Sequence, residues 1–245
     1  MRNCLLFLVL FCSFFGCHSS KKIVLLLPKN GREKMGGEQF FKQVLGANWQ
    51  QRDSAAVAEI LSGNVPAFLR QFSAITSSFS DSTGKIHQAV LYVSPDYLCI
   101  GNNHDFARVP LTAMAAQKIA DSLHCFLPTK KIVDLVYAQA KVKLSPVPMY
   151  IFRDSSITMW QHHLIIEGQR KGRKGLIAGI KKDVVISSKI DKDPKPNREA
   201  IYGWHSLDGK PIQPLYTGHI NWYTDYSHGA RLVFRNIKID GKWMD

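Results

Sequence analysis

The chain has 245 residues, 45% of them hydrophobic, and a formal net charge of +13. That length is enough to bury a sizeable core within one domain, and it leaves room for two subdomains. The excess of Lys and Arg favours polyanionic partners such as anionic lipid headgroups, acidic glycans or wall polymers, whereas the absence of a Walker or Rossmann glycine pattern argues against a nucleotide cofactor.

The first seventeen residues have the pattern of a bacterial signal peptide. An uncharged apolar run from Cys4 to Phe15 follows Arg2, and its length of about twelve residues suits an h-region, whereas a membrane-spanning helix needs about 20. Residues 14–17, Phe-Phe-Gly-Cys, resemble a lipobox, in which the cysteine, here Cys17, is acylated and becomes the mature N-terminus. We therefore expect an exported protein, periplasmic or at the outer surface, anchored to the membrane by a lipid on Cys17. Ordinary cleavage nearby and an uncleaved N-terminal anchor are the alternatives, and nucleic acid is not an expected partner.

The first half of the mature chain reads mainly as helices. Residues 23–27 predict a first strand or a hydrophobic tether, and apolar spacing predicts helices over 38–45 and 53–61. A polar loop is expected over 77–84, followed by strands over 87–93 and 97–100. Two further helices are predicted to begin after the N-caps Thr112 and Thr129.

Pro146 and Pro148 mark a break and a candidate internal boundary near residues 145–150. A helix over 155–169 and a basic loop over 170–174 follow, the loop being solvated or in contact with a membrane surface. Short strands are then expected over 184–186, 200–202, 211–215, 231–234 and 237–239. The fold class predicted is α+β (or α/β), a single globular domain over 18–245 with a helix-rich N-terminal half and a β-rich C-terminal half around one mixed sheet.

Two cysteines, Cys99 and Cys125, remain in the folded part. An exported protein permits a disulfide between them, and two buried thiols are the equal alternative. Their spacing does not match a zinc site.

Reactive side chains gather in the last third of the chain. Imidazoles carry protons near neutral pH, carboxylates fix tautomers or bind metals, and aromatic rings stack on sugars. A core strand needs none of these, so we predict a functional site, with an aromatic-rich β core bearing surface histidines as the alternative. The candidate catalytic residues are His205, His219, Tyr223, Asp225, Ser227, His228 and Arg231.

Three mechanisms fit this set. In the favoured one, His219, Asp225 and His228, with His205 in reserve, bind a zinc ion that activates water, although the spacing matches no short helical zinc motif. In another, a histidine and a tyrosine (Tyr223 or Tyr226) perform metal-free acid–base chemistry on an acidic polysaccharide, as in a lyase. Arg231 and Lys181 or Lys182 would neutralise that substrate.

The third mechanism uses Ser227 as a nucleophile, a histidine as base and Asp225 as the residue that orients it. No GxSxG segment is present, and Ser227 and His228 would point to opposite faces on a strand.

Residues 227–231, Ser-His-Gly-Ala-Arg, resemble the Ser-His-Gly-Cys-x-Arg motif of L,D-transpeptidases of the YkuD type. Ala230 stands where that motif has its nucleophilic cysteine, so transpeptidation by that mechanism is not expected, and the likeness suggests only a cell-envelope setting.

The chain as a whole resembles an uncharacterised family of exported bacterial proteins. The segments that carry the likeness are Leu-Pro-Thr-Lys (127–130), Lys-Asp-Val-Val (182–185), Tyr-Gly-Trp-His (202–205), Pro-Ile-Gln-Pro-Leu (211–215) and Asp-Tyr-Ser-His-Gly (225–229). This resemblance implies no particular activity.

The sequence therefore leads to one main hypothesis, an envelope-anchored hydrolase that acts on a cell-wall or glycan polymer, with zinc as the candidate cofactor. The alternative is a non-catalytic envelope module that binds glycan or a partner protein through Trp204, Trp222 and Tyr223.

Overall fold

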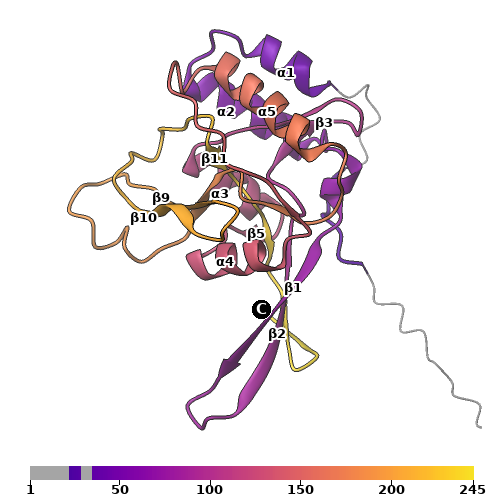
Figure 1. The fold of residues 1–245 in the computed structure, drawn as a ribbon, viewed down its shortest axis with the longest axis vertical. Helices are drawn as coiled ribbons and strands as arrows, with labels where there is room; N and C mark the ends of the chain where they lie inside the picture. Colours follow the sequence, from indigo (N-terminus) through magenta and orange to yellow (C-terminus); the bar gives the residue numbers. More distant parts are fainter. Residues whose placement is uncertain (1–21, 29–34) are drawn as a thin grey trace, which may run out of the picture.

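The structure, a computed structural model, describes residues 22–28 and 35–245. The predicted signal peptide and the lipidation expected at Cys17 lie outside the described residues. The predicted α+β class is confirmed (Figure 1). In chain order the elements are α1 (Gly37–Gln43), α2 (Trp49–Leu61), the 3-10 helix η1 (Ala67–Arg70), β1 (Ser73–Ser80), β2 (Ile86–Val93), β3 (Cys99–Gly101), β4 (Phe106–Arg108), α3 (Ala113–Ser122), β5 (Cys125–Phe126), α4 (Lys130–Gln139), β6 (Val142–Lys143), α5 (Ser156–Arg170), β7 (Ile177–Ala178), β8 (Lys182–Val185), β9 (Ala200–His205), β10 (Pro211–Tyr216), β11 (His228–Gly229), β12 (Val233–Phe234), β13 (Ile237–Ile239) and β14 (Lys242–Met244).

The longer helices begin at polar caps, which satisfy backbone N–H groups that have no partner inside the helix. Thr112 and Thr129 cap α3 and α4 as predicted, and Ser155 caps α5. Asn48 and Gln51 form a reciprocal capping box at the start of α2. The helices predicted after Thr112 and Thr129 and over 155–169 are therefore confirmed.

The strands are divided among several sheets, and the expected single mixed sheet is not found. Among the described residues, one sheet has six strands in the order β14-β13-β2-β12-β5, with β1 also paired to β2, and a second has the order β10-β9-β8-β11. Two further pairs, β3 with β4 and β6 with β7, stand apart. Most of these strands are only two to four residues long. The turns between them interrupt the pairing, so the strands do not form one continuous sheet.

Strands β1 and β2 form a long antiparallel ribbon that projects from the body of the molecule (Figure 1). The polar loop predicted over 77–84 is wrong in its first half, because β1 continues to Ser80 in register with Ile86. Most side chains at the outer end of the ribbon are exposed. The alternation of apolar and polar residues that marks a half-buried strand is therefore missing there.

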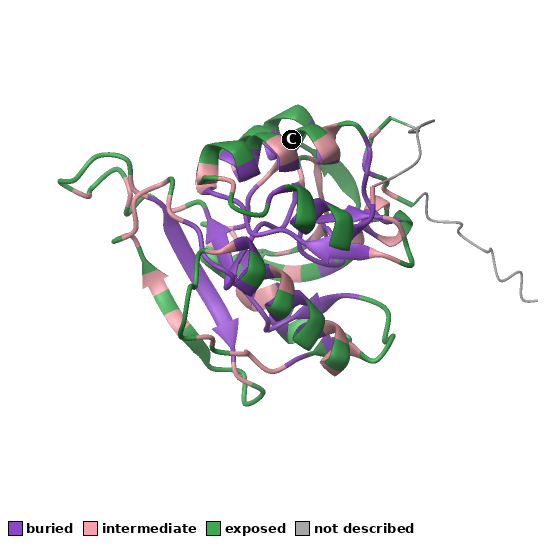
Figure 2. Ribbon diagram, turned by 90° about the horizontal axis from the view of Figure 1, so that it is seen from above, coloured by how far each residue is buried: buried purple, intermediate pink, exposed green. Residues whose placement is uncertain are grey.

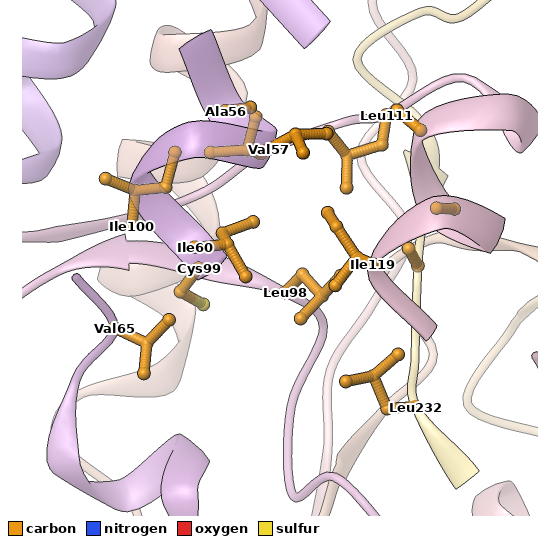
Figure 3. Packing of buried hydrophobic residues seen from close by; sticks show 14 of the residues in the cluster. Ala56, Val57, Ile60, Val65, Leu98, Cys99, Ile100, Leu111, Ile119 and Leu232 are labelled. Atoms are coloured by element: carbon orange, nitrogen blue, oxygen red, sulfur yellow. The ribbon is translucent and has the colours of Figure 1, made fainter. Parts of the chain in front are cut away.

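The main core lies between α2, β3 and α3, where Ile60, Leu98 and Ile119 are fully buried (Figure 3). The same cluster contains Met159 of α5 and Leu232 near the C-terminus. The main core therefore contains residues from both sides of the candidate boundary near residues 145–150.

The burial of the strands differs across the four-stranded sheet. Strands β8 and β9 are buried along their whole length, whereas the edge strand β10 is exposed or half-buried throughout (Figure 2). The functional residues described below lie beside the buried part of this sheet.

Cys99 and Cys125 are free, buried thiols, which settles the alternative left open by the sequence. No helix in residues 22–28 or 35–245 combines the length and the apolar character that crossing a bilayer requires.

Candidate metal centre

Three side chains from separate segments meet beside the β8–β9–β11 sheet. Glu199 immediately precedes β9, and His228 begins β11, which runs parallel to β8. The third, His219, comes from the segment after β10. Its carbonyl accepts a hydrogen bond from the backbone N–H of Glu199 at 3.2 Å, and Arg198 and Ile220 form an antiparallel bridge next to it. Backbone pairing thus places residues twenty positions apart side by side.

The three side chains have the geometry of a metal-binding cluster. One ligand atom from each of Glu199, His219 and His228 lies within 4.8 Å of the others. Oε1 of Glu199 is 3.0 Å from Nε2 of His228 and 3.4 Å from Nδ1 of His219. Glu199 and His228 are completely buried, while the His219 side chain is 27% exposed, so His219 is the accessible side of the cluster.

These distances match those between the ligands of a zinc ion. Metal–ligand bonds of about 2.1 Å in a tetrahedron put neighbouring ligand atoms roughly 3.4 Å apart. Oε2 of Glu199 is buried without a hydrogen-bond partner among the described residues, and Nδ1 of His219 has only its 3.4 Å contact with Oε1 of Glu199. Both atoms therefore have the capacity to bind a ligand.

A second layer of contacts fixes the orientation of His228. Nδ1 of His228, the ring nitrogen facing away from Glu199, is 3.1 Å from Oδ1 of the buried Asp225. The backbone N–H and hydroxyl of Ser227 both donate to the same oxygen, at 2.8 and 2.5 Å. Oδ2 of Asp225 accepts from Arg153 at 2.7 Å and from the Tyr223 hydroxyl at 3.2 Å. A histidine held this way by a carboxylate presents Nε2 to a metal.

The ionisation of the cluster favours a positive charge at its centre. Burial raises the pKa of Glu199, but its contacts with His219 and His228 outweigh burial and bring the pKa below its usual value. The same balance, with His228 and Ser227 as partners, holds the pKa of Asp225 well below its usual range. Burial lowers the pKa of His228, but hydrogen bonds to Asp225 and Glu199 bring it above its ordinary value. Two carboxylates and one arginine thus surround the imidazole, and a proton or a metal cation balances the remaining negative charge.

The structure changes the predicted set of ligands. Asp225 contacts Nδ1 of His228 and is not among the three residues whose ligand atoms converge. Glu199 is the third residue of the cluster, in the role that the sequence analysis gave to Asp225. The sequence analysis missed Glu199 because no local motif marks it. Its one signal is an acidic residue directly before a predicted strand, which is a common arrangement.

Five of the seven predicted catalytic residues lie together and two lie elsewhere. His219, Tyr223, Asp225, Ser227 and His228 form the cluster and its surroundings. His205 instead stacks on Tyr137 of α4 with ring centroids 4.4 Å apart and faces Asp134 at 3.3 Å. Arg231 is fully buried and donates to the carbonyls of Ser94 and Ile177.

The remaining candidate residues are also buried in the interior of the protein. Lys181, proposed from the sequence to neutralise a substrate, is buried, and its ammonium group contacts His162 and the carbonyl of Tyr226. Lys182 is buried too and lies over the ring of Trp204, itself a core residue. Neither lysine nor Arg231 is placed to neutralise a substrate, and Trp204 is not on the surface. The Ser227 hydroxyl contacts Asp225 and no histidine, so Ser227 has no base beside it.

Gly229, in the segment that resembles the transpeptidase motif, has a packing role. A Cβ at this position would lie 2.5 Å from Cδ1 of Tyr97 and 2.7 Å from Cβ of Lys181. The backbone therefore passes too close to these side chains for any other residue.

Two hollows flank the cluster. One has a volume of about 860 Å³ and is lined by Glu199, Asn221 and the exposed side of α3. The other, about 320 Å³, is lined by Tyr223, Trp222 and Trp49, and the two indole rings are stacked with centroids 6.5 Å apart. Residues 221–223 thus border both hollows and lie next to His219.

Comparison with other proteins gives no assignment. No family model, no curated protein and no solved structure matches this chain. The resemblances stated from the sequence therefore stay predictions, and function has to be argued from the site.

Proposed function

We propose that the protein is a metal-dependent hydrolase of the cell envelope that acts on a cell-wall or glycan polymer. The observation that carries the proposal is the convergence of Glu199, His219 and His228, in which Oε2 of the buried Glu199 has no hydrogen-bond partner among the described residues. Two imidazoles and one carboxylate are the ligands of several hydrolytic zinc sites, in which a fourth position holds water and the metal lowers its pKa to about 7.

Each neighbouring residue has a distinct part in this chemistry. Glu199, His219 and His228 would hold the metal, which would supply an activated water, and Asp225 fixes the ring of His228. Burial and the charge of Asp225 raise the pKa of Tyr223 to about 12, so its hydroxyl stays protonated at neutral pH. The Tyr223 ring packs against His219 with centroids 4.8 Å apart. If this hydroxyl exchanged its 3.2 Å bond to Asp225 for one to the substrate, it would donate to the oxygen that becomes negative during hydrolysis.

The shape around the cluster supports a polymeric substrate. An extended chain lying over residues 221–223 would enter the hollow that Glu199 and Asn221 line and the one that Trp222 and Tyr223 line. Trp49 and Trp222 offer aromatic rings on one side, which suits stacking on sugars. The predicted export signal and the charge of +13 favour an acidic polymer outside the cytoplasm.

Zinc content tests the proposal directly. We expect one zinc ion per chain after equilibration with zinc and dialysis, and its loss in Glu199→Gln and in His219→Ala. His104→Ala is the matched control, since His104 is an exposed histidine outside the cluster, and this variant should retain the zinc. A chain that binds no zinc, or a His219→Ala variant that keeps it, would contradict the metal site and leave Glu199, His228 and Asp225 as a structural charge network.

Activity is measured on the zinc-loaded protein with peptidoglycan and acidic wall glycans. Chelation should abolish the release of fragments and added zinc should restore it. Zinc binding without cleavage of any such polymer would favour the non-catalytic binding module, with Trp222 and Tyr223 as its contact residues. Products that carry an unsaturated sugar would identify a lyase.

A further inference from the structure

The loop before α5 and the outer face of that helix form one exposed apolar surface. Tyr150, Ile151 and Phe152 are consecutive and 86%, 69% and 77% exposed. On α5, Ile157, Leu164 and Ile165 are also exposed. We call these six residues the α5 surface, and a hollow of about 800 Å³ lies between its two parts.

The exposed residues of α5 follow helical spacing. Positions 157, 161, 164, 165 and 168 lie on one face and read Ile, Gln, Leu, Ile and Gly, with no charge among them. The opposite face is buried and includes Met159, His162 and Ile166. The helix is therefore apolar on the outside as well as the inside, along about 22 Å for fifteen residues.

Positive charge continues this surface at its C-terminal end. Lys171, Arg173 and Lys174 follow α5 directly and are exposed, and none of them forms an ion pair with a residue that the structure describes. At the other end, Arg153 and Asp154 carry opposite charges. The surface thus combines apolar side chains in the middle with a basic group at one end.

The loop that holds the aromatic residues is strained. Phe152 adopts the left-handed conformation with φ of 47°, which is uncommon for a bulky residue, and its carbonyl accepts from the N–H of Ser155. Backbone strain of this kind persists where the surrounding structure imposes it, and it is concentrated at sites of function. In this loop the strained backbone holds the large ring of Phe152 in solvent.

We infer that the α5 surface docks the protein onto an anionic lipid bilayer. Aromatic and aliphatic side chains beside a basic cluster are the arrangement that binds at the boundary between headgroups and acyl chains, where apolar residues enter about 5–10 Å. Unpaired lysines next to such a surface are attracted to anionic headgroups. A protein partner of matching charge would need acidic residues opposite the basic end, and an apolar groove opposite three consecutive protruding residues.

This contact would bring the candidate metal centre close to the membrane. Arg153 follows the exposed loop and donates to Asp225, and the Tyr226 hydroxyl accepts from the N–H of Met149. The inference does not depend on zinc, since the docking residues are not ligands.

Site-specific labels test the contact in the full chain, independently of its N-terminus. With Cys4, Cys12 and Cys17 replaced by Ser, Ile151→Cys carries an environment-sensitive fluorophore, and the native Cys99 and Cys125 are buried. Leu207→Cys, in the exposed turn between β9 and β10, is the matched control. On phosphatidylglycerol vesicles we expect a blue shift and quenching by brominated acyl chains at position 151 and neither at position 207.

Charge reversal tests the basic end. Lys171→Glu with Lys174→Glu should raise the lipid concentration that gives half of the shift on the order of ten-fold or more, and vesicles of phosphatidylcholine alone should bind at least as weakly. Equal responses of the two labels, or no effect of charge reversal, would overturn the inference. A shift at position 151 that rises with protein concentration without vesicles would overturn it in favour of a second copy of the chain.

Discussion

At the scale of single residues, His228 is the side chain on which the candidate site depends. It is completely buried between two carboxylates, with one ring nitrogen on each. Nδ1 lies 3.1 Å from Oδ1 of Asp225 and 3.2 Å from the backbone N–H of the same residue. Without a metal, a ring protonated on both nitrogens would donate to both carboxylates. With a metal bound by the cluster, Nε2 and Glu199 would be ligands and Nδ1 would keep its contact with Asp225. The same arrangement therefore accommodates a proton or zinc, and a metal would also give a partner to Oε2 of Glu199.

Asp225 gives a test of the layer behind the ligands. Asp225→Asn should weaken zinc binding about 10- to 100-fold, because the amide is a poorer acceptor and no longer fixes the ring of His228. Titration against a competing zinc chelator measures the change.

Tyr223→Phe is the control for this substitution. It removes the 3.2 Å hydrogen bond to the other carboxylate oxygen of Asp225 and leaves the contact with His228 in place. Zinc affinity should stay near that of the wild type. If Asp225→Asn binds zinc as tightly as the wild type, Asp225 does not position His228.

The residues of the site could be predicted only in part. His219, Tyr223, Asp225 and His228 are close in sequence, so their types and density identify the region. Glu199 is twenty residues before His219, and only the pairing of 198–199 with 219–220 brings it there. His205 fits the same pattern of residue types, yet its strand directs it to Asp134 and Tyr137. No spacing rule separates these two cases.

At the scale of elements, local signals decided which predictions succeeded. The helices α3 and α4 combine a threonine cap with apolar residues at helical spacing, and both signals are local. The ribbon strand β1 has neither, because it is held by its pairing with β2 and faces solvent. The division of the strands among sheets also depends on distant pairing, such as that of β12 with both β2 and β5.

The ribbon contains a pH-sensitive contact. His87 bridges Asp240 at 2.7 Å and Asp81 at 3.1 Å, and these hydrogen bonds raise its pKa above the ordinary value. A raised pKa means that the protonated histidine is favoured in the folded ribbon. Its stabilising contribution is therefore complete below about pH 6.5, the usual pKa, and is lost as the pH rises through the folded pKa.

Hydrogen exchange of the β1 and β2 amides checks this expectation. Protection should exceed that of His87→Gln at pH 5.5, and the difference should vanish at pH 9. His104→Gln, which changes an exposed histidine outside the ribbon, should behave as the wild type. An NMR titration of His87 with a pKa at or below 6.5 would refute the prediction.

At the scale of the whole molecule, the net charge of +13 belongs to the outside, because the buried charged side chains among the described residues are five basic and five acidic and cancel. Arg108 lies within the protein with Asp96 at 2.6 Å and Glu167 at 2.7 Å, and Arg231 lies over the ring of Tyr97. Burial lowers the pKa of Lys181 to about 7, so part of its charge is absent at neutral pH. The excess positive charge is therefore carried by exposed groups, such as the basic end of the α5 surface.

Because one core includes residues from both sides of 145–150, we expect the chain to unfold cooperatively as one unit. Met159 of α5 is fully buried in the same cluster as α2 and α3, on the other side of residues 145–150. Met159→Ala should cost about 2–5 kcal/mol of unfolding free energy. It should also lower hydrogen-exchange protection in α2 and α3 as much as in α5, because one core links them. The control Met114→Ala changes an exposed methionine of α3 and should cost less than about 0.5 kcal/mol. Loss of protection confined to α5 would show instead that the chain unfolds as two units divided near residues 145–150.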